Sequence, residues 1–170
     1  MRYFSGFCLQ NEQELFSEYL DSSDISVAGF SYGAIKAYEY ALNSTKRVDK
    51  LILLSPAFFQ TKKPSYIRTQ LRYYQTNPQT YIKNFLANVT YPTTIDISSY
   101  LHPQSIDDLR YLLEYKWDKD GLKTLTAKGT TIEVWIGQQD KIIDYQDILE
   151  FFQDIAQIYL LKDAGHILHI

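Results

Sequence analysis

The pentapeptide GFSYG at residues 29–33 constrains this chain more than any other feature. It follows an apolar run, residues 25–28, and opens a helical pattern, residues 34–42. A serine with a glycine two residues away on each side, at a strand-to-helix junction, is the nucleophile-elbow pattern. The glycines remove side chains that would collide across the sharp turn. The following helix aims free N–H groups at the turn, where they can hold an oxyanion. The motif therefore predicts an acyl hydrolase with Ser31 as its nucleophile.

Strand-like and helical patterns alternate along most of the chain. Apolar runs rich in β-branched or aromatic residues predict strands at 2–4, 25–28, 50–54, 131–136 and 157–161. Helical spacing of apolar residues predicts helices over 11–20, 34–42 and 144–152. This alternation favours an α/β fold with a short, mostly parallel sheet, helices on its faces, and a site at the carboxyl ends of its strands.

The middle of the chain departs from this rhythm and indicates a helical lid. Ser65 is placed to cap one helix, and Pro78 to start another. Ser105 and Asp108 have capping-box spacing, and Gly129 is a plausible stop. We therefore expect a single domain of 170 residues, with a core at 1–59 and 130–170 and a lid at about 60–129.

Two further residues complete a catalytic triad with Ser31. A serine hydroxyl needs a base, and the base needs an orienting acid, in the chain order Ser, Asp or Glu, His. Asp140 and His166 follow the last two predicted strands and supply that order. Asp144, one helical turn further on, is an alternative acid. A purely structural role is the alternative for His166.

The other histidines lack such a placement. His102 lies before a proline inside the lid, where a surface or capping role is expected, and His169 is the penultimate residue, where fraying is expected. An oxyanion hole requires two backbone N–H groups. The sequence favours the N–H of Tyr32, which follows the nucleophile, and that of Phe7, which follows the first strand and a glycine.

Composition narrows the possible function classes. Cys8 is the only cysteine, which excludes an internal disulfide framework, and we expect it to be a small buried hydrophobe near the site. The three histidines lack zinc-ligand spacing, so we expect no metal and no cofactor. We find no secretory signal pattern and no apolar span, and we expect a cytoplasmic protein without membrane or nucleic-acid partners.

Charge is divided unevenly between the lid and the remainder of the chain. Residues 60–128 hold ten Lys and Arg against six Asp and Glu, a net charge of +4; the remainder holds seven against fourteen, a net charge of −7. A basic lid on an acidic body suggests an acidic partner, although an uneven solvated surface would give the same totals.

The chain resembles α/β-hydrolases, and within them the compact pimeloyl-acyl carrier protein methyl ester esterases of the BioV type. The resemblance rests on RYFSGF at 2–7, GFSYGAIKA at 29–37, LLSP at 53–56, IEVWIG at 132–137, DKI at 140–142, and KD at 162–163 with His166. Full-length α/β-hydrolases begin with further strands, and most have a histidine where this chain has Ser5.

The resemblance implies a serine esterase of biotin biosynthesis that hydrolyses the methyl ester of pimeloyl-acyl carrier protein and releases methanol. It also implies an acidic carrier protein as partner, for which the candidate contacts are Lys62, Lys63, Arg68, Arg72 and Arg110. Aromatic candidates for an acyl tunnel, each equally suited to the lid core, are Tyr66, Tyr73, Phe85, Tyr111 and Trp117. A thioesterase, a general small-ester hydrolase and a non-catalytic binding module on this scaffold are the alternatives.

Overall fold

The computed structural model describes residues 1–170 and contains one five-stranded parallel sheet. The strands are β1 (Arg2–Phe4), β2 (Ser26–Phe30), β3 (Lys50–Leu54), β4 (Thr131–Gly137) and β5 (Gln157–Leu161). They lie side by side in chain order, and every neighbouring pair is parallel. All five strands predicted from the sequence are present, each within about two residues of its expected bounds.

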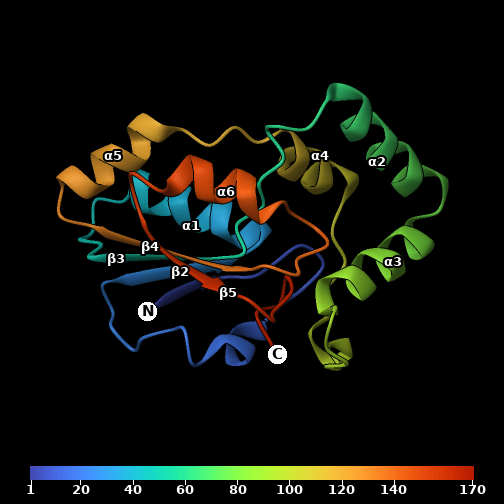
Figure 1. The fold of residues 1–170 in the computed structure, drawn as a ribbon, viewed down its shortest axis with the longest axis horizontal. Coiled ribbons are helices and arrows are strands. Elements are labelled where there is room, and N and C mark those ends of the chain that lie inside the picture. Colours follow the sequence, from blue (N-terminus) through green and yellow to red (C-terminus); the bar gives the residue numbers. More distant parts are fainter.

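Three helices cover one face of the sheet: α1 (Tyr32–Asn43), α5 (Lys119–Ala127) and α6 (Tyr145–Phe152). Figure 1 shows them together above the strands, with a short 3-10 helix, η1 (Glu12–Phe16), and the C-terminus below. Successive residues of a strand point to opposite faces. Leu51 and Leu53 accordingly join the larger apolar cluster under the helices, whereas Ile52 and Leu54 join a second cluster with Phe16 of η1.

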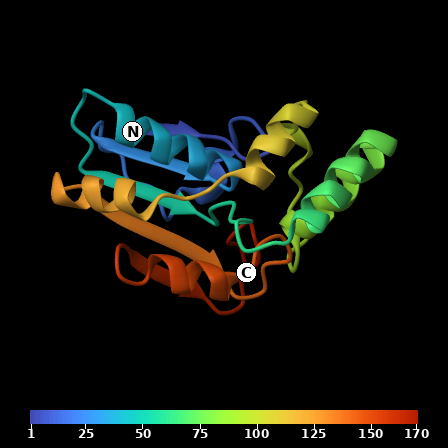
Figure 2. The same cartoon turned by 90° about the horizontal axis from the view of Figure 1, so that it is seen from above.

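The remaining helices lie at the end of the sheet where the strands terminate. They are α2 (Pro64–Thr76), α3 (Pro78–Thr90), the 3-10 turn η2 (Ser98–Tyr100) and α4 (Ile106–Glu114). Figures 1 and 2 show α2 and α3 projecting beyond the sheet, with α4 between them and the sheet layer. We call residues 60–116 the cap. It is shorter than the expected lid of 60–129, because α5 packs on α1 and β4 through the buried Leu122 and Leu125.

Three local expectations were wrong. The helix expected over 11–20 is only the five-residue 3-10 helix η1, followed by turns. Helix α2 begins at Pro64 with Lys63 before it, so Ser65 is not its cap. His169 does not fray: its ring Nε2 lies 2.6 Å from the carbonyl oxygen of Leu15, which ties the C-terminus to the segment around η1. Here tertiary contacts prevail over the local signals.

Candidate active site

The nucleophile elbow connects β2 to α1 in a strained conformation. Ser31 has φ 53° and ψ −112°, a backbone conformation that residues other than glycine rarely adopt. A Cβ atom on Gly29 would lie 2.1 Å from the carbonyl oxygen of Gly33, and one on Gly33 would lie 2.0 Å from that of Phe4. The Ser31 N–H donates to the carbonyl of Leu54 at 2.8 Å, which anchors the turn to the next strand. The two glycines are therefore required by backbone packing.

Ser31, His166 and Asp140 are brought into hydrogen-bond contact from three separate segments. His166 Nε2 lies 2.9 Å from Ser31 Oγ, and His166 Nδ1 lies 2.6 Å from Asp140 Oδ2. A carboxylate can only accept, so Nδ1 carries the ring proton and Nε2 is free to accept from the serine hydroxyl. The side chains of His166 and Asp140 are fully buried, and Ser31 is 2% exposed. This is the geometry of a serine nucleophile with its general base and orienting acid.

Asp140 is held in place from its other side. Its Oδ1 accepts the N–H groups of Ile142 and Ile143, at 2.7 and 3.0 Å. The alternative acid, Asp144, instead caps α6 by accepting the N–H of Gln146 at 3.0 Å. His102 is exposed, and its backbone N–H donates to the carbonyl of Cys8. The alternatives thus have roles outside the constellation.

Both N–H groups expected to form the oxyanion hole are unoccupied by protein partners. Tyr32 is the first residue of α1, where no helical carbonyl precedes it to accept the N–H. Phe7 lies in the loop after β1, is 1% exposed, and donates its N–H to no protein group. The rings of Phe7 and Tyr32 meet edge to face, with centroids 6.4 Å apart. The two segments therefore adjoin at the elbow.

Two buried residues beside the site were missed by sequence reasoning. Ser55, at φ 41° after β3, donates its hydroxyl to the backbone carbonyl of His166 at 2.6 Å. Glu12, fully buried in η1, accepts the N–H of Gly6 at 2.7 Å. A serine after a strand and a glutamate in a polar segment are too common to signal such roles. Only their burial makes them conspicuous.

Cys8 is buried next to Phe7, as expected. Burial is the main cause that raises the pKa of its thiol, to about 12. At neutral pH the group is therefore a protonated, poorly reactive thiol. No group of three or more His, Cys, Asp or Glu side chains is arranged to hold a metal ion.

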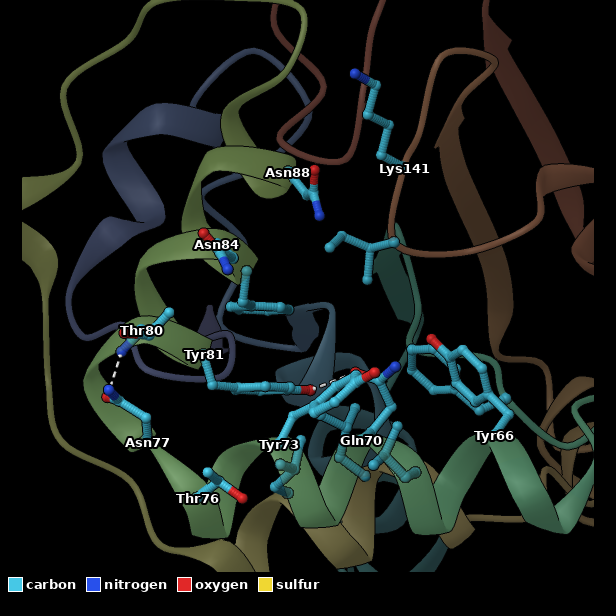
Figure 3. A pocket seen from close by; sticks show the side chains of 16 residues that line it. Tyr66, Gln70, Tyr73, Thr76, Asn77, Thr80, Tyr81, Asn84, Asn88 and Lys141 are labelled. Carbon is cyan, nitrogen blue, oxygen red and sulfur yellow. Dashed lines mark hydrogen bonds between the residues drawn. The ribbon is translucent and has the colours of Figure 1, made fainter.

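A cavity of about 480 Å³ lies in the cap beside the triad. Its apolar side includes Phe59, Phe85 and Leu112, and its polar side includes Asn84 and Asn88 of α3. Figure 3 shows these asparagines near the cavity, with the hydroxyl of Tyr81 bonded to Gln70. The ammonium of Lys141 points away from the other lining residues and lies 3.2 Å from the ring centroid of Tyr91. The cavity thus offers apolar and uncharged polar groups.

The cavity does not reach the triad directly. Phe85, which lines it, packs edge to face on Phe7 with centroids 5.6 Å apart; no triad residue is among the lining residues, and Ser31 is nearly inaccessible. A substrate that occupies the cavity meets the nucleophile only if side chains between the two move. We therefore interpret the structure as a closed state of the site.

The other residues expected to bind substrate are divided between two locations. Tyr66, Tyr73 and Phe85 line the cavity. Trp117 does not: it is core, and its Nε1–H donates to the carbonyl of Ala57 at 2.9 Å. Tyr111 is also outside, packed edge to face on Tyr32.

The five expected carrier contacts lie on the cap, and none forms an ion pair. Lys63, Arg68, Arg72 and Arg110 are exposed, and Lys62 is half-buried. Arg68 and Arg72 project from a face of α2 other than the face with Tyr66, Gln70 and Tyr73 that lines the cavity. They lie on the outer surface of the cap.

The fold is shared with solved structures at low sequence identity. An esterase from Exiguobacterium antarcticum superimposes with TM-score 0.66 and 16% identity, over 91% of this chain and 63% of that one. A bromoperoxidase from Bacillus anthracis gives 0.68 and 14%, over 92% and 65%. BioG from Haemophilus influenzae gives 0.59 and 9%, over 97% and 87%.

These likenesses establish that the chain has an α/β-hydrolase fold. The chain spans less than two thirds of the length of the esterase and the bromoperoxidase. No family model matches the sequence, and a search of curated proteins gives no match. None of the helices combines the length and apolar character needed to cross a bilayer.

Proposed function

We propose that the protein is a serine carboxylesterase. The observation that carries the proposal is the pair of contacts at His166, to Ser31 at 2.9 Å and to Asp140 at 2.6 Å, inside a buried site. This arrangement turns a weak hydroxyl nucleophile into an effective one, because the imidazole removes its proton as it attacks.

The reaction proceeds in two acyl transfers. Ser31 Oγ attacks the ester carbonyl while His166 Nε2 takes the hydroxyl proton, and the N–H groups of Phe7 and Tyr32 bind the oxyanion. The protonated imidazole gives that proton to the alcohol as the ester bond breaks, which leaves an acyl group on Ser31. Water then attacks the acyl group with His166 again as base, and the acid and free Ser31 are released. Asp140 stabilises the imidazolium in both halves.

We further propose that the substrate is a methyl ester of pimeloyl-acyl carrier protein. Motifs spread from residue 2 to residue 166 resemble the esterases that act on it. A cavity of about 480 Å³ with apolar and uncharged polar walls suits a capped, uncharged acyl chain. The unpaired cations on the outer cap suit an acidic carrier.

The decisive experiment combines a mutation, a probe and an assay of the released product. Ser31→Ala should lower hydrolysis of pimeloyl methyl ester by about 10⁴-fold or more, because the nucleophile is lost. A fluorophosphonate probe should label the wild type at Ser31 and leave the variant unlabelled. A fully active Ser31→Ala variant contradicts the proposed mechanism. A wild type that is neither labelled nor active contradicts the proposal and favours a binding module.

The same triad would serve a thioesterase, so product analysis must separate the two substrates. We expect methanol to be released from the carrier-bound methyl ester while the thioester to the carrier stays intact. Release of free carrier thiol, with the methyl ester still intact on the released acid, would contradict the proposed substrate but not the mechanism.

A further inference from the structure

The loop after β1 contains one backbone N–H without a protein partner among five successive residues. The Gly6 N–H donates to Glu12, and the Cys8 N–H donates to the side chain of Gln104. The Leu9 and Gln10 N–H groups donate to the carbonyls of Gly6 and Tyr100. Only the N–H of Phe7 is left, in a residue that is 1% exposed. Unpaired buried N–H groups are rare, so this one calls for a reason.

The direction of that N–H is determined by its own peptide unit. The Gly6 carbonyl, on the same unit, accepts the Leu9 N–H at 3.1 Å. In a trans peptide the C=O and N–H point in opposite directions, so the Phe7 N–H points away from Leu9. It can keep this direction only if the peptide units on either side do not rotate.

Each neighbouring unit is held by a side chain from elsewhere in the molecule. Glu12 Oε1 accepts the Gly6 N–H at 2.7 Å and the hydroxyl of Tyr3 at 3.0 Å. The Glu12 carboxyl is fully buried, and its Oε2 has no partner. A buried carboxyl with an unsatisfied oxygen is destabilising, which makes a purely structural reason for it weak.

The second side chain comes from the cap. Gln104 Oε1 accepts the Cys8 N–H at 3.0 Å, and its own carbonyl accepts the hydroxyl of Tyr74 in α2 at 2.7 Å. The Cys8 carbonyl in turn accepts the His102 N–H at 2.9 Å. The cap is therefore bonded to the loop at the residue directly after Phe7.

We propose that Glu12 and Gln104 are positioning residues that hold the Phe7 N–H toward the substrate oxyanion. The inference rests on the proposed esterase function. It assigns the buried carboxyl of Glu12 a task in catalysis that is carried out through the backbone, without contact to the substrate.

The test compares four variants on a p-nitrophenyl ester. Glu12→Leu and Gln104→Leu remove the acceptor, whereas Glu12→Gln and Gln104→Glu keep an oxygen at the same reach. Losing one oxyanion donor lowers kcat about 10²- to 10³-fold, so partial misplacement should lower kcat about 10- to 100-fold in the leucine variants. We expect KM within about twofold and near-normal kcat in the conservative variants.

A transition-state analogue distinguishes positioning from a general loss of stability. A trifluoromethyl ketone adds to Ser31 and places an oxyanion in the hole, so its affinity should fall by the same factor as kcat in the leucine variants. The control is Thr130→Val. Thr130 is a buried residue directly before β4, at the end of the strands opposite the triad, and its hydroxyl donates to the Val48 carbonyl at 2.7 Å; the valine removes this bond. It should lower the melting temperature and leave kcat and analogue affinity unchanged.

Wild-type kcat and analogue affinity in both leucine variants would overturn the inference while leaving the esterase function intact. So would a loss of activity that a smaller folded fraction accounts for in full, with kcat per folded molecule unchanged. If Glu12→Leu does not fold, Gln104→Leu against Gln104→Glu decides the question. A wild type that fails both the ester assay and fluorophosphonate labelling removes the proposed function, and the inference falls with it.

Discussion

Ser31 combines a reactive position with a strained backbone. Its φ of 53° and ψ of −112° suit glycine, and strain of this kind is worth on the order of 1–3 kcal/mol. The hydrogen bond from its N–H to Leu54 and the close packing of Gly29 and Gly33 hold the turn in that conformation. This strain lowers the stability of the folded protein, and the same conformation places the hydroxyl beside the imidazole.

We predict that Ser31→Gly is more stable than Ser31→Ala by about 1 kcal/mol, because both lose the hydroxyl but only glycine relieves the backbone strain. Urea unfolding of the two inactive variants measures the difference. Ala34→Gly, at a buried helical position, serves as the opposite control and should be destabilising. Equal stability of the two Ser31 variants would mean that the elbow stores no strain.

At the scale of elements, α4 of the cap is tied to α1 through the residue after the nucleophile. The hydroxyl of Tyr32 donates to Asp108 at 3.1 Å, and Asp108 also closes the capping box of α4 with Ser105. Hydrogen bonds from Ser105 chiefly, and then from Tyr32, lower the pKa of Asp108. The folded pKa is depressed, so this contribution to stability is present above the unfolded value of about 3.9 and is lost as pH falls through the folded one.

Tyr32→Phe should loosen the cap while keeping the backbone N–H of residue 32. A hydrogen bond to a carboxylate at a partly exposed site is worth about 1 kcal/mol, so amide hydrogen exchange in α4 should become about fivefold faster. We expect the difference to be constant between pH 6 and 8, to shrink below about pH 4, and to be lost as the pH falls through the lowered pKa of Asp108. Tyr111→Phe, which loses the bond from α4 to Glu39 of α1 and leaves Asp108 untouched, is the matched comparison: its effect should not change near pH 4 in the same way. Unchanged exchange in Tyr32→Phe would show that this contact does not hold the cap.

At the scale of the whole molecule, the exposed cations and the buried triad lie in different parts of the protein. The triad is buried under the cap, and the free cations lie on the outer surface of the cap. Under the proposed function, a carrier protein would meet the basic surface first, and its acyl chain would reach Ser31 after side chains of the cap move.

Charge reversal on the cap should weaken carrier binding selectively. We predict that Arg68→Glu with Arg72→Glu raises KM for carrier-bound ester about tenfold or more at low salt and leaves the p-nitrophenyl ester unaffected. The control is the double variant Lys46→Glu with Lys128→Glu. These two exposed cations lie together near the amino ends of the strands, at the end of the sheet away from the cap. Equal losses on both substrates, or an equal effect of the control, would exclude a docking role for Arg68 and Arg72.

Much of this architecture could be predicted from the sequence because its signals are local. The strands, the elbow at residues 29–33 and the capping box at Ser105 each follow from neighbouring residues. Chain order and strand-end placement pointed to Asp140 and His166, because parallel strands terminate on one edge of the sheet. Local signals failed at residues 11–20, where a short 3-10 helix forms with Glu12 and Phe16 buried.

The sequence by itself determined which residue types are available and in which order they follow the strands. Only the tertiary structure decided that Asp140 and not Asp144 faces the imidazole, that α5 belongs to the helices covering the sheet, and that Glu12 and Gln104 flank the free N–H of Phe7. The physical reason is the distance along the chain over which each effect acts. Backbone preferences act over a few residues, whereas burial and hydrogen bonds join residues about a hundred positions apart or more.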